Sequence, residues 1–282
     1  MYKRFILTLL VLVIACGCSV FKQTGSTQQP PSGNQTPVGT RTPTFSPTRK
    51  PIVFVWGEVL MGIRNMTMYL KTPQYLLVEN PEKRGVEFDP NLYFTVLELL
   101  SMEPGYTLDY VYSYDNVSGQ PYLYARLVDQ APYRNINELT KATGLPAADS
   151  RYNYLDHVLI TDIEEGFFQF AVLYVVGDQF YLYSLTRYND TRLILDTNNV
   201  TSALNSVADF GIKVPGFIKN QALSIDLTPV IKMGSEIVTV RVVTFTMWGG
   251  FYENVYTIQR NPPHKISVES MNLVPYNIDN QY

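Results

Sequence analysis

The chain of 282 residues carries 22 basic and 25 acidic side chains and is 46% hydrophobic, which is typical of globular proteins. Six of the basic residues and none of the acidic ones precede residue 51, so residues 51–282 have 16 basic and 25 acidic side chains, a net charge of −9. This sign argues against nucleic acid as a partner, because Lys and Arg contacts to phosphate supply most of that affinity.

The first 15 residues have the pattern of an export signal. Lys3 and Arg4 give a positive start, and an apolar run follows from Phe5 to Ala15, broken only by Thr8. A helix that crosses a bilayer needs about 20 apolar residues, so this shorter run predicts a cleavable signal peptide, residues 1–15, rather than a transmembrane helix.

The signal peptide leads into Val13-Ile14-Ala15-Cys16, which resembles the lipobox of bacterial lipoproteins. The resemblance implies that the Cys16 thiol takes a diacylglyceryl group, that cleavage occurs just before it, and that the new amine is often acylated, for example with palmitate. Two or three acyl chains anchor a protein stably, whereas one binds only marginally. We therefore expect an extracytoplasmic protein on the cell membrane, or on the outer membrane of a cell with two membranes.

Two alternatives to lipidation at Cys16 stay open at this stage. Ala15-Cys16-Gly17-Cys18 is a second match to the same pattern, which makes Cys18 the alternative attachment site. The other alternative is an ordinary secretory signal followed by two incidental cysteines.

The composition changes after the signal peptide. Residues 16–50 are dominated by Thr, Ser, Pro, Gln and Gly and have almost no apolar side chains. Such a segment cannot offset its chain entropy by burial, so we expect a disordered linker. Both cysteines of the chain lie at the start of this linker, so the rest can have neither a disulfide nor a thiolate metal site. Residues 51–282 show no second linker and no fixed repeat, which predicts a single domain.

Two β-branched or aromatic runs predict strands before residue 186 of this domain. The first is Ile52–Glu58. The second, Phe167–Leu185, is the most apolar stretch of the mature chain, and Gly177-Asp178 within it can form a two-residue turn. Both of its faces are apolar, so we expect a hairpin that is covered on both sides and forms the core.

Strands are also predicted near the C-terminus. Glu236–Trp248 and Phe251–Arg260 flank Gly249-Gly250, which predicts a hairpin with those two glycines as its turn, so that the flanking Trp and Phe pair at the tip. The chain is expected to return to strand after Pro215, and His264–Pro275 to add a last strand.

A first helix is predicted after Asp89-Pro90, because Asp can cap a helix and Pro fits its first turn. Pro104-Gly105 would end this helix. Its apolar side chains recur at helical spacing and are Leu92, Val96, Leu99 and Leu100.

Two further helices have clear boundary signals. Asn135 and Glu138 have the spacing of a capping box, and Gly144 would end that helix. A later helix starts at Asp196 or Thr197 and ends at Gly211. Hairpins with two or three packed helices predict an α+β fold with a mainly antiparallel sheet, preceded by the disordered stalk.

The most unusual local pattern is a hairpin rich in tyrosine. Tyr110, Tyr112 and Tyr114 alternate along one strand, and Tyr122 and Tyr124 begin the return strand. The first three share one face, but the register that would place the other two is not fixed by the sequence. Tyrosine suits both a sheet core and the recognition of sugars, peptides or proteins.

Motifs of known chemistry are missing from the sequence: there is no phosphate-binding glycine loop, no Gly-x-Ser-x-Gly and no His-Glu-x-x-His. The densest acidic cluster comprises Asp156, Asp162, Glu164 and Glu165, with His157 among them. These side chains could perform acid–base chemistry if they converged, could hold calcium through their oxygen atoms, or could form a solvated loop.

We therefore expect a lipid-anchored cell-envelope protein without cofactor or metal, whose domain is a non-enzymatic binding or scaffolding module for an envelope protein or glycan. The binding residues predicted for an exposed aromatic patch are Tyr110, Tyr112, Tyr122, Tyr124, Trp248 and Phe251. The alternative is an envelope hydrolase, and its candidate catalytic residues are His157, Asp162, Glu164 and Glu165.

Overall fold

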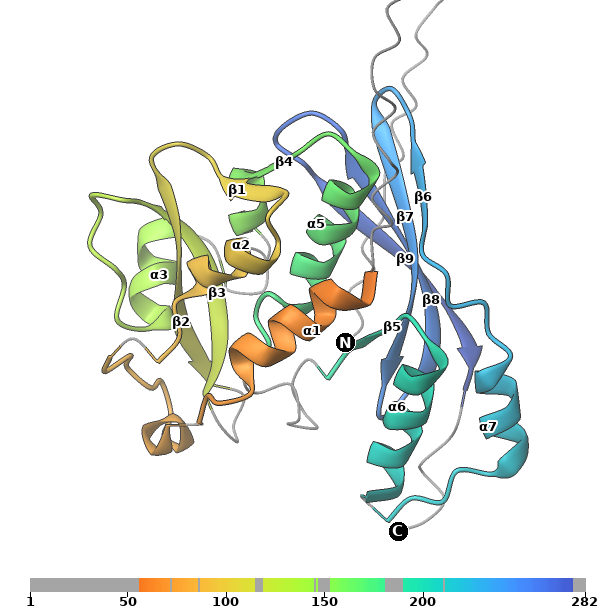
Figure 1. Cartoon of the computed structure of the whole chain (residues 1–282). Helices are drawn as coiled ribbons and strands as arrows, with labels where there is room; N and C mark the ends of the chain where they lie inside the picture. The colour runs from red at the N-terminus through yellow and green to blue at the C-terminus, as the bar shows by residue number, and fades with distance from the viewer. Residues whose placement is uncertain are drawn as a thin grey trace, which may run out of the picture. The chain divides into compact units, whose positions relative to one another are not determined.

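The computed structural model describes residues 56–71, 73–85, 87–114, 119–144, 146, 153–180, 190–209 and 211–275 (Figure 1). Helices and antiparallel sheets alternate in this part of the chain, which confirms the predicted α+β fold. None of the helices described there has the length and apolar character needed to cross a bilayer. The signal peptide, the linker, both cysteines and residues 52–55 of the first predicted strand lie outside the described residues.

The first described element is the helix α1, Trp56–Thr67, so the strand predicted for Ile52–Glu58 is wrong from Trp56 onward. Val59, Ile63 and Thr67 recur every four residues and are buried, which is a helical spacing. The β-branched and aromatic residues at the start of this segment had favoured a strand in the prediction. Close packing against α2, described below, needs Gly62, because a Cβ there would lie 2.5 Å from Val96 Cγ1.

The predicted helix after Asp89-Pro90 exists but is shorter than expected. Asp89 caps a 3₁₀ turn, η2, Pro90–Leu92, by accepting a hydrogen bond from Asn91 N at 2.9 Å, and α2, Tyr93–Val96, continues it. The chain then forms the strand β1, Leu100–Met102, which pairs with β4, Val158–Ile160. The prediction of one continuous helix over residues 92–100 is therefore wrong, because the helix ends at Val96 and the chain pairs as a strand from Leu100.

The predicted tyrosine hairpin is confirmed as β2, Tyr106–Tyr114, paired with β3, Gly119–Leu127. A short 3₁₀ turn, η1, Gln74–Leu77, precedes it in the chain. The helix α3, Ile136–Thr143, is also confirmed: Asn135 Oδ1 accepts from Glu138 N at 3.0 Å, and Gly144 ends the helix at φ +69°.

Residues 164–176 form a helix rather than a strand. After the 3₁₀ turn η3, Asn153–His157, and the strand β4, the chain enters α5, Glu164–Val176, so the hairpin predicted around Gly177-Asp178 is wrong up to residue 180; residues 181–185 lie outside the described residues. Ten of the 13 residues of α5 are buried. A helix covered on all sides has no polar stripe, so its sequence resembles a buried strand. The expected central position is nevertheless correct.

The C-terminal part of the chain builds a five-stranded antiparallel sheet in the order β5-β7-β8-β9, with β6 also paired to β7. Its strands are β5, Arg192–Ile194; β6, Val230–Met233; β7, Ile237–Thr246; β8, Gly250–Gln259; and β9, Ile266–Val274. The predicted C-terminal hairpin and last strand are confirmed, but the turn is not. Phe251 pairs with Phe245 rather than Trp248, because the turn has three residues, Met247–Gly249, and Gly250 adopts φ +86°.

Two helices lie between β5 and β6. The predicted helix is confirmed as α6, Thr197–Asp209, with Val200, Ala203, Leu204 and Val207 as its buried stripe. The strand expected after Pro215 is wrong, because the helix α7, Gly216–Leu223, follows instead and buries Ile218 and Ala222, four residues apart.

The helices pack on opposite faces of the five-stranded sheet (Figure 1). Val238, Val240 and Val242 of β7 belong to the main core with α5. Val243 and Phe245 belong to a second core with α6 and α7, which lie toward one end of the sheet. This arrangement leaves part of the second face without a helical layer.

Candidate functional site

The predicted aromatic patch is not on the surface. Tyr110 and Tyr112 are 1% and 0% exposed, Tyr122 and Tyr124 are 6% exposed, and Phe251 is 0% exposed. Only Trp248, in the turn between β7 and β8, is exposed, at 48%. The prediction of one contiguous exposed patch of these residues is therefore wrong.

Both faces of the tyrosine hairpin are covered, which explains the burial. Tyr110 pairs with Leu123, whereas Tyr122 pairs with Val111, so Tyr122 and Tyr124 point to the face opposite Tyr110 and Tyr112. One face packs against the main core, and the other packs against α3. The alternating tyrosines therefore belong to a hairpin that is buried on both faces, and they do not form a binding surface.

The hydroxyl groups on the core side converge on one carboxylate. Tyr75 and Tyr110 donate hydrogen bonds to Glu87, and Tyr112 Oη donates to Glu87 Oε2 at 3.2 Å. Burial, together with the hydrogen bond to Glu87, raises the pKa of Tyr110 well above the usual tyrosine value. The Tyr110 hydroxyl therefore stays protonated, and together with Tyr112 it connects Glu87 to the hairpin.

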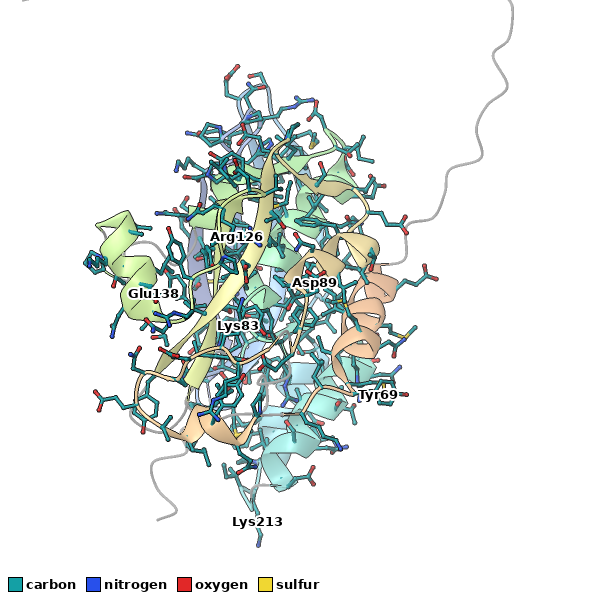
Figure 2. All side chains as sticks on the ribbon, turned by 90° about the vertical axis from the view of Figure 1, so that its left-hand side faces the viewer. Tyr69, Lys83, Asp89, Arg126, Glu138 and Lys213 are labelled. Carbon is teal, nitrogen blue, oxygen red and sulfur yellow. The ribbon has the colours of Figure 1, made fainter. Side chains whose placement is uncertain are left out.

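A second cluster on the hairpin pairs opposite charges. Lys83 and Arg126 both bind Asp109, the latter through Nε at 2.9 Å, and all three side chains are at most 18% exposed. Lys83 also lies over the ring of Tyr110, 4.5 Å from its centroid. Figure 2 shows Lys83 and Arg126 beside the hairpin, with Glu138 of α3 to one side. Each charge has a partner, so the cluster stabilises the hairpin rather than presenting a reactive group.

The acidic residues of the hydrolase hypothesis do not converge. Both carboxylate oxygens of Asp162 bind Arg260 at 2.8 Å, and Asp156 binds Lys265. Glu164 and Glu165 lie in the first turn of α5, where negative side chains interact favourably with the positive end of the helix dipole. Within the described residues, no group of three or more His, Cys, Asp or Glu side chains could hold a metal ion.

The two histidines occupy different environments. His157 stacks on Tyr106 with centroids 3.8 Å apart, and its Nδ1 lies 2.8 Å from Glu103 Oε2. His264 is 3% exposed, and its Nδ1 lies 2.9 Å from the Gln259 carbonyl. Burial lowers the pKa of His264 below its usual value. The two histidines therefore have different partners and different degrees of exposure.

The surface that the sequence analysis missed is the outer face of the five-stranded sheet. Along β7, alternate residues point away from the main core, and we call this surface the open face. Its residues are Val230 and Lys232 of β6; Ile237, Thr239 and Arg241 of β7; Glu253, Val255 and Thr257 of β8; and Ser267, Glu269 and Met271 of β9. The signal in the sequence was the alternation of Val238, Val240 and Val242 with Thr239 and Arg241, typical of a strand with one wet face.

The open face combines apolar, polar and charged groups. Val230, Ile237 and Met271 are 38%, 47% and 55% exposed. Near them, Arg241 Nε donates to Glu253 Oε2 at 2.7 Å, and the guanidinium also donates to the main chain next to β6. A fixed ion pair beside exposed apolar side chains gives this face specific contacts to offer to a partner surface.

Comparisons with protein-family models, with curated proteins and with solved structures find no match to this chain.

Proposed function

We propose that the chain is a lipid-anchored cell-envelope protein and that its folded domain is a binding or scaffolding module without catalytic activity. The open face of the five-stranded sheet is the binding surface, and its partner is another envelope protein. The observation that carries this proposal is the exposure of the apolar side chains Val230, Ile237 and Met271 on a face whose other side forms the main core.

The chemistry of the open face suits a protein partner. A non-obligate interface is about as apolar as the rest of a protein surface and gains specificity from polar groups at its rim. Ile237 and Met271 supply exposed apolar area, while Lys232 and Glu269 supply opposite charges at the two sides of the face. A strand-rich face is also rigid, so little ordering entropy is lost when it binds.

The anchor is proposed from the sequence of the N-terminal region. The apolar run that ends at Cys16 resembles a lipoprotein signal, and the linker after it lacks apolar side chains. Taken as a flexible coil, the 34 residues 17–50 span about 30–35 Å. A domain on such a tether samples the membrane-proximal space, where envelope proteins are concentrated.

The alternative function, an envelope hydrolase, has less support from the geometry. A carboxylate pair that performs acid–base chemistry must face a common substrate position. Asp162 instead binds Arg260 with both oxygens, and Asp156 binds Lys265. These ion pairs connect the region before α5 to the C-terminal strands, which is a structural role.

Mass spectrometry of the amino terminus from native membranes tests the anchor. We expect a diacylglyceryl group on Cys16, lost in the Cys16→Ser variant and kept in the Cys18→Ser variant. A terminus that begins after residue 18, or that retains the signal peptide, would contradict the anchor.

Site-specific photo-crosslinking in cells tests the binding surface. A photoreactive residue at Thr239 or Lys232 should form an adduct with another envelope protein. The same residue at Met61, which is 62% exposed on α1, is the matched control and should give none. Equal labelling from all three positions, or none from the open face, would refute the proposal.

A further inference from the structure

The strand β9 lies at the edge of the five-stranded sheet. Along one side it pairs with β8 from Ile266 to Val274, and the strand order places no described strand on its other side. The six consecutive residues Ser267–Asn272 are exposed. A strand of nine residues with one side unpaired among the described strands is a template for a further strand.

The ladder with β8 shows which main-chain groups face outward. Gln259 N donates to Lys265 O at 2.9 Å, and bonded pairs alternate with non-bonded pairs along an antiparallel ladder. The odd-numbered residues of β9 therefore bond to β8. The residues whose N–H and C=O groups point away from β8 are Ile266, Val268, Ser270 and Asn272.

This edge has little of the protection that natural edge strands carry. Proline, lysine and inward-pointing charges usually prevent an edge from pairing. The strand β9 has no proline and no basic residue, and Glu269 is its one charged residue. A register shift opposite Phe251 and Tyr252 interrupts the ladder only at the far end of the strand. Val268 and Met271 are 38% and 55% exposed, so added pairing would also cover apolar side chains.

We propose that β9 pairs with β9 of a second copy of this chain, antiparallel and about a two-fold axis at Ser270. Outward-facing residues must meet outward-facing residues, so even-numbered positions of one copy pair with even-numbered positions of the other. In this register Ser270 faces Ser270 of the second copy, and Val268 faces Asn272. About six main-chain hydrogen bonds form.

The carboxylate of Glu269 favours this register over the one centred on Glu269 itself. An axis at Glu269 would place two carboxylates directly opposite each other, which destabilises a strand pair. An axis at Val268 would bring Asn272 of one copy against His264 of the other, next to the turn at Pro262-Pro263. With the axis at Ser270, each Glu269 faces Met271 of the second copy, so an exposed apolar side chain is covered without a like-charge contact. The interface is isologous, which suits a closed dimer.

This pairing goes beyond the proposed function, because it requires neither the lipid nor the envelope partner. It would join two five-stranded sheets edge to edge and place two open faces side by side. An interface made of one strand pair buries little surface area, so we expect reversible association. Tethering both copies to one membrane would raise their effective concentration and favour the dimer.

Disulfide trapping in the full chain tests the register, because no cysteine follows Cys18. In membranes from a Cys18→Ser background, Ser270→Cys should yield a disulfide-linked dimer on mild oxidation, since the paired Cα atoms lie about 5.5 Å apart. Ser267→Cys, exposed on the same strand, is the matched control. It faces residue 273 of the second copy, so its own counterpart is out of reach.

A charge pair at Met271 sharpens the test without disturbing the core. Met271→Lys places a cation opposite each Glu269 and should raise the trapped fraction of the Ser270→Cys protein several-fold at low salt. Met271→Glu places like charges there and should lower it several-fold. Val268→Pro removes an outward N–H group and should abolish the dimer, while thermal unfolding of the variant reports whether it still folds.

Several outcomes would overturn the pairing. These are equal trapping at Ser270→Cys and Ser267→Cys, the same response to Met271→Lys and Met271→Glu, and no dimer in membranes. An adduct of Ser270→Cys with a different protein would assign the edge to that protein rather than to a second copy. Loss of the dimer would leave the adducts from Thr239 and Lys232 unchanged, so it is distinguishable from failure of the proposed function.

Discussion

The two hairpins of the molecule, β2–β3 and β7–β8, have similar β-prone sequences and different surroundings. The first is covered on both faces, by the main core and by α3, and its aromatic side chains are buried. The second is covered on both faces only near its turn; beyond that, one face packs on α5 and the other is open.

The difference shows that the exposure of a strand side chain in this protein depends on whether a helix covers its face of the sheet, and not on its residue type. The tyrosines of β2–β3 look like a recognition surface in sequence, but they serve as core and as donors to Glu87. The less unusual sequence of β7 carries the open face. The following predictions test this contrast between a closed hairpin and an open one.

Among the side-chain truncations, the largest expected loss of stability comes from a tyrosine of the closed hairpin. Tyr110→Ala should destabilise the protein by about 3–5 kcal/mol, because a fully buried aromatic side chain leaves a cavity. Tyr69→Ala is the matched control: its side chain is 81% exposed after α1 (Figure 2), and the cost should be within about 0.5 kcal/mol. Denaturant unfolding of both variants measures the difference, and equal losses would show that the hairpin is not closed.

A smaller effect is expected from the buried charge cluster of the same hairpin. Asp109→Ala leaves Lys83 and Arg126 without their common anion, and this should cost about 3 kcal/mol. Asp162→Ala removes a carboxylate of similar geometry, but that carboxylate is 55% exposed, so the loss should be much smaller and should shrink with added salt. Unfolding curves at low and high salt compare the two. A salt-sensitive loss at Asp109 would contradict its burial.

The sequence predicted those elements whose signals are local. Asn135 with Glu138 marked the start of α3, and the tyrosine alternation marked β2–β3, because capping and pleating depend on residues a few positions apart. The α+β class follows from such elements. The missed elements depend on tertiary contacts: α5 is covered on all sides, so its helical period is invisible, and α7 has only two buried residues to mark it.

The candidate site was harder to predict than the fold, because its contacts are distant in sequence. Asp162 and Arg260 are separated by 98 positions, and Tyr112 and Glu87 by 25. The sequence of one segment alone therefore could not show that these side chains bind each other and have a structural role. Whether an aromatic face is exposed depends likewise on α3 and the main core. The alternation along β7 was visible, but the sequence does not say which face a helix will cover.

A pH dependence provides a third, more moderate test. The unfolded chain protonates His264 near pH 6.5, whereas burial lowers its pKa in the folded protein despite the nearby carboxylate of Asp162. The folded state is therefore favoured above pH 6.5, and this contribution is lost as the pH falls through the lower, folded pKa.

Thermal unfolding between about pH 7.5 and 5.5 measures this loss. The His264→Gln variant should lose that part of the pH dependence. The chain has only one other histidine, and the His157→Gln variant leaves His264 in place, so it is the matched control for this part of the dependence. A dependence that disappears with His157→Gln instead would show that His264 is not its source.

The smallest expected effect lies on the open face and gives the most direct test of the contrast, because two neighbouring residues should respond oppositely. Ile237 is 47% exposed on the open face, whereas Val238 is 0% exposed in the core with α5. Ile237→Lys should change the free energy of unfolding by no more than about 0.5 kcal/mol. Val238→Lys buries a charge without a partner and should prevent folding. Circular dichroism with thermal unfolding compares the two.

The near-neutral cost of Ile237→Lys is what makes it informative about binding. If the open face contacts an envelope protein, this added charge should reduce the photo-crosslink from Thr239 while leaving the fold and the β9 pairing intact, since Ile237 lies on β7, two strands away from the edge. A stable variant with an unchanged adduct would show that Ile237 lies outside the interface. An unstable variant would show that this face is covered, like the faces of the tyrosine hairpin.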